Sequence, residues 1–246
     1  MRITLALLVV GGVLTTAAFV MAFTVAAVPD FGTVTVAQEA DTVRELKEVT
    51  EDGYVYGRPD WGQKIFYFHV PVAEASFLVL FFTAFYGVRF LMTKRRGFDV
   101  RARIATEVTL LFVTLTMITG VLWTRAAWGV WWEWEPRLTT YFILTLMVIG
   151  YFVLRNSIED EERRATYAAA FGILAFINAP ISFFVTRLLP STHPVIERGG
   201  LQPPMLVAFI LAQIGMLMIG YAVYRLRMRE EQVNDDLEQL KLALEG

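Results

Sequence analysis

The sequence predicts an all-α integral membrane protein, a bundle of six transmembrane helices with a tryptophan-rich segment on its outer face. Three observations support this prediction. Hydrophobic residues make up 56% of the 246-residue chain, which is more than an ordinary soluble domain contains. The sequence has six apolar runs that are long enough to cross a bilayer. The charged connections between these runs favour one orientation of the bundle.

The predicted spans follow one another along a single membrane domain, residues 1–246. The first apolar run is longer than the roughly 7–15 residues of a signal-peptide core, so we expect a retained anchor. The fifth span contains INAPI, where Pro180 is expected to kink the helix and Asn178 to satisfy the freed backbone. The six spans cover approximately residues 3–28, 65–92, 104–124, 138–154, 166–189 and 204–224.

The distribution of lysine and arginine predicts which ends of the spans face the cytoplasm. Arg2 and the connections 94–103, 155–164 and 225–229 hold twelve of these residues, whereas the opposite side holds eight over a longer stretch. The positive-inside rule therefore places both termini and the amphipathic tail, 225–246, in the cytoplasm. The segments expected on the outer face are 30–63, of which 34–63 is expected to form a small cap, 125–137 and 190–203.

The composition also excludes some classes of site. The chain has no cysteine, so it has no CxxC redox motif, no CxxCH haem-attachment motif and no zinc–thiolate site. A net charge of −2 predicts no attraction to nucleic acid.

Tryptophan and histidine gather on the predicted outer face. Five of the six tryptophans lie between Trp123 and Trp134, and the only two histidines, His69 and His193, lie at outer ends of spans. Tryptophan is common at membrane interfaces, but an interfacial belt draws on many helices rather than one connection. If WGVWWEW were a surface helix, Trp128, Trp131 and Trp132 would share one face, which suits bilayer contact or a flat apolar ligand.

Haem is a ligand that would use all of these groups. Imidazole is a standard axial ligand of haem iron, and arginine pairs well with carboxylates such as the haem propionates. Glu74, five residues after His69, is a candidate to orient a ligand because a carboxylate inside the membrane is costly; alternatively it pairs with Arg125 or caps a helix. The candidates for binding propionates are Arg125, Arg137 and Arg198.

Several motifs resemble those of the haem exporter protein C family (CcmC), which belongs to the tryptophan-rich "WWD" haem-handling proteins together with CcmF and CcsA. WGVWWEWEPRLT, 128–139, resembles the signature WGxxWxWDxRLT, and FYFHVPVA, 66–73, resembles YxHVPxA. INAPI, 177–181, is similar to the VNxPI stretch of the family, and THP, 192–194, matches the place of its second histidine. The resemblance runs from about residue 64 to about residue 225.

The resemblance implies a haem-transfer protein and not an enzyme, in the bacterial cytoplasmic (inner) membrane, with haem b as its cargo at the periplasmic face. His69 and His193 would be the axial ligands of the haem iron. The haem would pass to the chaperone CcmE for c-type cytochrome biogenesis, and the ABC transporter subunits CcmA and CcmB and the small membrane protein CcmD would be further partners. The implied haem cradle consists of Trp123, Trp128, Gly129, Trp131, Trp132, Trp134, Glu135, Arg137 and Leu138.

Some features depart from the family pattern and leave alternatives open. Glu135 stands where the family usually has aspartate, and the following Pro136 is closer to the CcsA cytochrome c synthetases. Segment 34–63 is also longer than the family predicts. The alternatives are a CcsA-like haem lyase acting directly on apocytochrome, an electron-transfer cytochrome b, and a membrane transporter whose tryptophans are only interface anchors.

Overall fold

The computed structural model describes residues 1–26, 47–50, 53–56, 64–191, 193 and 201–245. Within these residues six helices are long and apolar enough to cross a membrane, which confirms the predicted fold class. The helices are α1 (Arg2–Thr24), α3 (Phe66–Thr93), α4 (Arg96–Trp128), α5 (Pro136–Asn156), α6 (Glu161–Leu188) and α7 (Pro203–Glu245).

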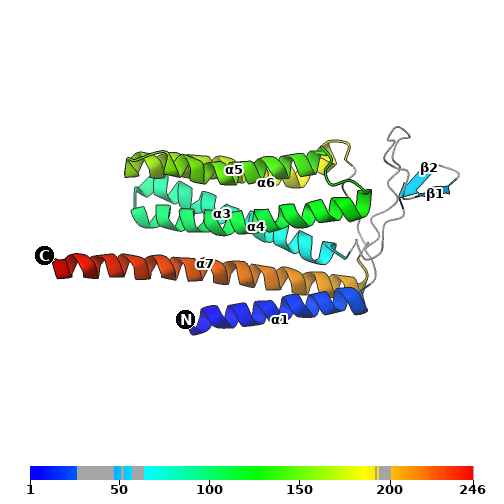
Figure 1. The fold of residues 1–246 in the computed structure, drawn as a ribbon, viewed down its shortest axis with the longest axis horizontal. Helices are drawn as coiled ribbons and strands as arrows, with labels where there is room; N and C mark the ends of the chain where they lie inside the picture. Colours follow the sequence, from blue (N-terminus) through cyan, green and yellow to red (C-terminus); the bar gives the residue numbers. More distant parts are fainter. Residues whose placement is uncertain (27–46, 51–52, 57–63, 192, 194–200, 246) are drawn as a thin grey trace.

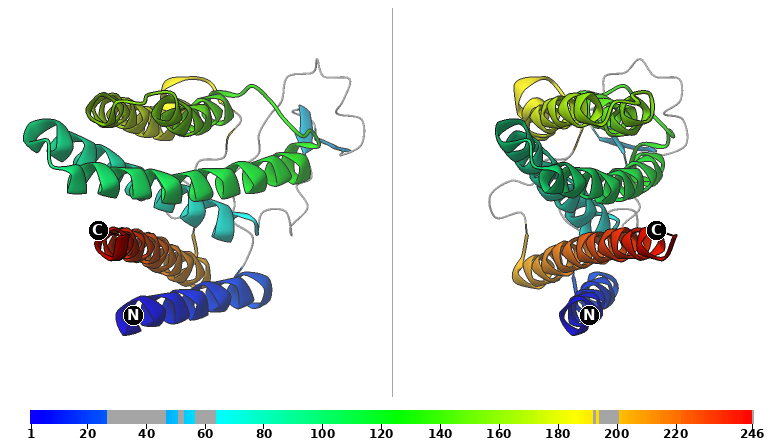
Figure 2. Two further views of the ribbon diagram at one scale, coloured as in Figure 1. Left: turned by 60° about the vertical axis from the view of Figure 1, so that its left-hand side comes forward. Right: turned by 90° about the vertical axis from the view of Figure 1, so that its left-hand side faces the viewer.

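The helices pack as three antiparallel pairs stacked in layers (Figures 1 and 2). α5 pairs with α6, α3 pairs with α4, and α1 pairs with α7, while α3 also touches both α6 and α7. The α1–α7 pair depends on small residues, since a Cβ atom at Gly215 would lie 2.8 Å from the Gly11 carbonyl oxygen. Such close backbone approach is typical of helix association inside membranes. The α3–α4 layer therefore lies in the middle of the molecule.

Both chain ends lie at one end of the bundle, which we call the terminal end (Figure 1). The opposite end, where His69 and His193 lie, is called the histidine end. A short antiparallel hairpin, β1 (Lys47–Thr50) and β2 (Gly53–Tyr56), also lies at the histidine end (Figure 1). The hairpin falls in the segment predicted as a small cap; the remainder of 34–63, apart from these strands, lies outside the described residues.

Helices at the terminal end extend further than the sequence predicted. The charged connection expected at 94–103 is mostly the first turns of α4, and the tail continues α7 without a break instead of forming a separate helix. Ion pairs stabilise the charged turns where these helices extend. Arg155 donates to both carboxylate oxygens of Asp99, at 2.6 and 2.9 Å, and Arg227 lies 2.7 Å from Glu107. These pairs join α4 to α5 and to α7.

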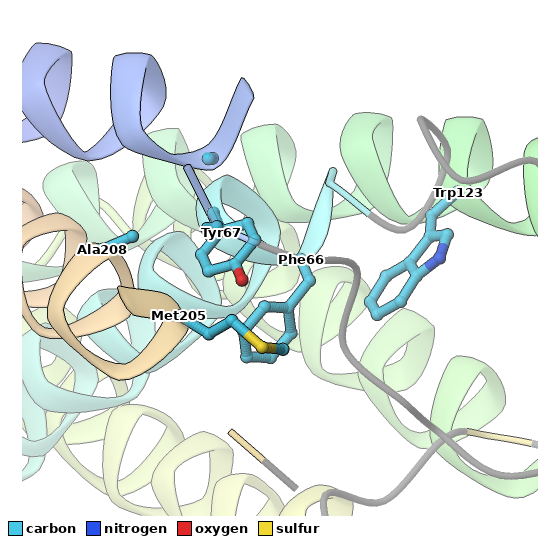
Figure 3. Close-up of a cluster of buried hydrophobic side chains, with 7 residues drawn as sticks. Phe66, Tyr67, Trp123, Met205 and Ala208 are labelled. Atoms are coloured by element: carbon cyan, nitrogen blue, oxygen red, sulfur yellow. The ribbon is translucent and has the colours of Figure 1, made fainter. Parts of the chain in front are cut away.

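A buried apolar cluster at the histidine end fixes the start of α3. Figure 3 shows Phe66 and Tyr67 of α3 beside Met205 and Ala208 of α7. Trp123 of α4 belongs to the same cluster and is only 6% exposed. Large buried aromatic side chains contribute strongly to packing, so this cluster helps to hold α3, α4 and α7 together at the histidine end.

Candidate functional site

A cavity of about 310 Å³ lies at the histidine end, between α3, α4, α5, α6 and α7. This volume is at the low end of the roughly 300–1,000 Å³ of small-molecule sites. Of the residues singled out from the sequence, those that line the cavity are His69, Glu74, Trp123, Trp128, Trp132, Arg137, Leu138 and His193.

The two histidines, far apart in sequence, meet at one tryptophan. His69 lies in the first turn of α3, and His193 lies in the connection that follows α6. The Trp123 ring makes an edge contact with both imidazoles, with centroid distances of 5.5 Å to His69 and 6.3 Å to His193. Trp128 contacts His193 from another side, also at 6.3 Å. The two imidazoles therefore line the same cavity, and both contact the Trp123 ring.

Only part of the tryptophan segment contributes to the cavity. α4 continues to Trp128 and ends there because Gly129 adopts φ 75°, a left-handed conformation that glycine takes readily. The following residues are not helical, so the surface helix considered as one reading of WGVWWEW, with Trp128, Trp131 and Trp132 on one face, does not form. Trp131 and Trp134 are 60% and 70% exposed and do not line the cavity.

Glu135 joins the tryptophan segment to the connection that holds His193. Its Oε1 accepts from the Leu138 backbone N–H at 2.5 Å and caps α5, while its Oε2 accepts from the Ser191 hydroxyl at 2.6 Å. The same Oε1 lies 3.6 Å from Nδ1 of His193. Burial opposes ionisation of Glu135, but His193, Ser191 and the Arg137 backbone N–H together hold the pKa of Glu135 below its ordinary value. Glu135 is therefore a carboxylate at neutral pH.

Two arginines line the cavity, and the sequence predicted only one of them. Arg137 is the second residue of α5 and lines the cavity, with its guanidinium 5.7 Å from the Phe183 ring. Arg187, near the end of α6, also lines the cavity, and the structure shows no ion pair for it among the described residues. Arg125 instead donates to the Gly129 carbonyl and lies over Trp131, outside the cavity. Arg198 lies outside the described residues.

Glu74 also lines the cavity and lies five residues after His69 within α3. No described residue pairs with it within 4 Å, and the charge that it faces is Arg137. The suggested partner Arg125 and the suggested helix cap are both wrong, because Arg125 is engaged with Gly129 and Glu74 is inside a helix. Asn178 also differs from expectation: its side-chain amide donates to the Thr140 carbonyl at 2.9 Å and links α6 to α5.

Further contacts around the histidines were not predicted from the sequence. Thr119 lies 2.9 Å from Nδ1 of His69, and Gly120 lies against the same ring. Ser191 accepts from the His193 backbone N–H at 3.1 Å. Ser191 precedes His193 by two residues within PSTHP, so its contact with His193 could have been inferred from the sequence. Thr119 and Arg187 gave no such signal, because only the packing of α3, α4, α5 and α6 brings them to the cavity.

Comparison with known proteins gives one consistent family. The family model described as "CcmC: Heme exporter protein C" matches residues 14–243. "Heme exporter protein C" of Bradyrhizobium diazoefficiens is 30% identical over 184 residues, which cover 73% of this chain and 70% of that protein. The protein of the same name from Haemophilus influenzae is 26% identical over 196 residues, 76% of this chain and 80% of its own length. A "Putative cytochrome c biosynthesis ccmC-like mitochondrial protein" of Marchantia polymorpha is 34% identical over 130 residues, 53% of this chain and 54% of that protein.

Proposed function

This chain belongs to the haem exporter protein C family, and we propose that it binds haem in the cavity at the histidine end and hands it to a haem chaperone. One observation carries the proposal: His69 and His193 line the same cavity and contact the same Trp123 ring. Two neutral imidazoles are the axial ligands that bis-histidine haem iron requires. With haem bound, they would hold the iron from helix α3 and from the connection after α6.

The residues that line the cavity fit the rest of a haem molecule. Trp123, Trp128 and Trp132 provide flat apolar walls, which suit a porphyrin ring. The indole N–H groups of Trp128 and Trp132 are buried and have no hydrogen-bond partner among the described residues. A buried donor without a partner is costly, so these two groups suit a ligand that brings its own acceptors. The small cavity volume implies that part of the ring remains outside, available to a partner.

Holding haem by one edge suits a transfer protein. On this proposal the chain supplies no nucleophile; it holds the iron through two side chains and leaves the covalent chemistry to the protein that receives haem b. The receiver would be the haem chaperone CcmE, and CcmA, CcmB and CcmD would complete the membrane assembly for c-type cytochrome biogenesis. The lysine and arginine distribution supports a periplasmic histidine end and cytoplasmic termini.

Arg137 and Arg187 are the proposed partners of the two propionates. Two guanidinium groups on one cavity favour a ligand with two carboxylates. We expect Arg137→Gln and Arg187→Gln each to weaken haem binding roughly 10–150-fold, which corresponds to the loss of one charge-assisted hydrogen bond of roughly 1.5–3 kcal/mol. The measurement is a titration of the purified protein with haem and with haem dimethyl ester, in which both carboxylates are neutral.

The ester separates a propionate contact from a general loss of fold. The wild type should bind haem more tightly than the ester, whereas each variant should lose part of that preference. Arg125→Gln is the matched control, since Arg125 faces away from the cavity and the variant should keep the full preference. Equal preference in the wild type and in both cavity variants would disprove the propionate assignment.

Cross-linking tests transfer to a chaperone and distinguishes it from direct lyase action. A photoreactive amino acid at Trp134, which is 70% exposed at the histidine end, should capture a haem chaperone in cells that make c-type cytochromes. The same group at Val153, 60% exposed near the other end of α5, should not. Capture of an apocytochrome at Trp134, with no chaperone, would favour the CcsA-like lyase instead.

A further inference from the structure

We propose that Thr119 is a positioning residue that fixes the protonated nitrogen of His69, so that Nε2 of His69 is the atom left to bind iron. The hydroxyl of Thr119 lies 2.9 Å from Nδ1 of His69. The contact joins α4 to α3 across fifty residues of sequence. The part of the inference that concerns iron rests on the proposed haem binding, but the part that concerns the proton does not.

The direction of this hydrogen bond follows from the other neighbours of Thr119. Its Oγ1 also lies 2.8 Å from the Leu115 carbonyl oxygen and 3.2 Å from the Thr116 carbonyl oxygen. A threonine hydroxyl has one proton and two lone pairs, whereas a carbonyl oxygen can only accept. The proton therefore points to a carbonyl of α4, as is common for threonine within a helix. The hydroxyl is left to accept, so Nδ1 of His69 must donate.

A neutral imidazole carries one N–H. If Nδ1 of His69 holds the proton, Nε2 has a free lone pair and is the atom able to bind a metal. In protein metal sites the nitrogen that does not bind the metal usually donates to a nearby acceptor, which sets the tautomer and the ring orientation. Thr119 is placed to be that acceptor.

Two neighbours on α4 restrict the ring further. A Cβ atom at Gly120 would lie only 3.1 Å from Cε1 of His69, so the backbone of α4 lies close against the ring edge between the two nitrogens. Trp123 meets the ring edge-on, at an interplanar angle of 74°. Thr119, Gly120 and Trp123 together seat the imidazole from one helix. A hydrogen bond at Nδ1 is thus made by a ring that has little freedom to turn.

The first test observes the proton directly and needs no haem. The full-length chain is labelled with ¹⁵N-histidine, placed in lipid nanodiscs and studied by NMR at pH 8. This pH is above the ordinary imidazole pKa of about 6.5. Because the chain has only two histidines, His193→Gln leaves the His69 ring signals alone in the spectrum. We expect the proton on Nδ1 with Thr119 present, and a tautomer mixture in Thr119→Val, which keeps the side-chain shape but cannot accept. Thr119→Ser should restore the Nδ1 proton.

The second test measures haem binding in the chain that retains both histidines. It compares the wild type with Thr119→Val, Thr119→Ser and a control variant. We expect Thr119→Val to lower the affinity for haem about 10–100-fold, the usual effect of losing a partner of a metal-bound histidine. The midpoint potential of haem bound to Thr119→Val should be higher than in the wild type, because an imidazole without this hydrogen bond is a weaker electron donor to the iron. Thr119→Ser should stay close to the wild type. Thr109→Val is the matched control: among the described residues, the Thr109 hydroxyl bonds to the Ala105 carbonyl of α4 and to no other group, so this variant should change neither the affinity nor the midpoint potential.

The possible outcomes separate this inference from the proposed function. A proton on Nε2 of His69, or a tautomer unchanged by Thr119→Val, would overturn the inference even if haem binds normally. A wild type with the proton on Nδ1 that binds no haem would instead contradict the proposed function and leave the role of Thr119 in setting the tautomer intact.

Discussion

Alanine in place of either His69 or His193 is expected to convert a low-spin haem spectrum into a high-spin one. With both histidines present, the iron would have two strong-field imidazole ligands, and removal of one leaves five-coordinate iron. We expect the haem retained through purification to fall roughly tenfold or more in each variant, because each would lose one of the two proposed protein bonds to the iron. The measurement is the absorption spectrum of the detergent-purified protein, oxidised and reduced, with the haem content per chain.

Added imidazole provides the control for this experiment. Free imidazole should enter the space left by the missing ring and restore the low-spin spectrum, which an unfolded variant would not allow. Rescue should be easier at His193, which lies in a connection, than at His69, whose place is enclosed by α4. Low-spin spectra and normal haem content in both variants would show that the axial assignment is wrong.

Glu135→Ala is expected to have the second largest effect, because this one carboxylate makes several contacts at the site. The variant loses the cap of α5, the bond from Ser191 and the negative charge beside Nδ1 of His193. Loss of the cap costs about 0.5–2 kcal/mol of stability. Loss of the group beside a haem-binding histidine should cost a further 10–100-fold in haem affinity. Thermal unfolding and haem titration measure the two effects separately.

A matched cap variant separates the stability effect from the effect on binding. Asp160 caps α6 by accepting from the Arg163 backbone N–H at 2.8 Å, and it lies at the terminal end. Asp160→Ala should lower the unfolding temperature by a similar amount and leave haem affinity unchanged. Glu135→Gln keeps an oxygen for the cap but loses the charge. We therefore expect this variant to retain most of the thermal stability and only part of the haem affinity. If Glu135→Ala and Asp160→Ala lower haem affinity equally, Glu135 has only a structural role.

The resemblance left the role of glutamate at position 135 open, and the structure gives it a specific set of contacts. The Glu135 side chain, which is 5% exposed, accepts hydrogen bonds both from the nearby Leu138 backbone N–H and from the Ser191 hydroxyl, 56 residues further along the chain. Its neighbour Pro136 occupies the first position of α5, where a missing N–H has no cost. The sequence Glu135–Pro136 is therefore compatible with a capped helix start. Pro136 alone is not evidence for the lyase alternative.

The transporter alternative receives little support from the described helices. A transporter of the kind considered would have paired broken helices near the middle of the membrane. α6 remains a single helix from Glu161 to Leu188 with Pro180 inside it, and Asn178 bonds to α5. Within the described part of the chain each of the six membrane-competent helices is unbroken. The tryptophans also do more than anchor an interface, since three of them line the cavity.

The number and approximate position of the six helices could be predicted from the sequence alone. Six apolar runs predicted six helices because a bilayer leaves the backbone of each span no other hydrogen-bond partners, so hydropathy alone specifies the helical spans. The motifs around His69, His193 and Trp128–Trp134 predicted the site, since two histidines, a tryptophan segment and arginine are the groups that haem would need. The helix ends were predicted less well, because charged residues such as Arg96 and Glu230 can continue a helix once ion pairs hold it.

Which of these residues share the cavity depends on how the helices pack, and the sequence did not reveal it. Three of the five clustered tryptophans face it, and Arg137 is joined there by Arg187 from another helix, whereas Arg125 turns away. Thr119 becomes the partner of His69 only because α4 packs against α3. The physical reason is that a helix presents each side chain in a direction set by its rotation about its own axis. Contacts between helices fix that rotation, and the pattern within any one helix does not contain it.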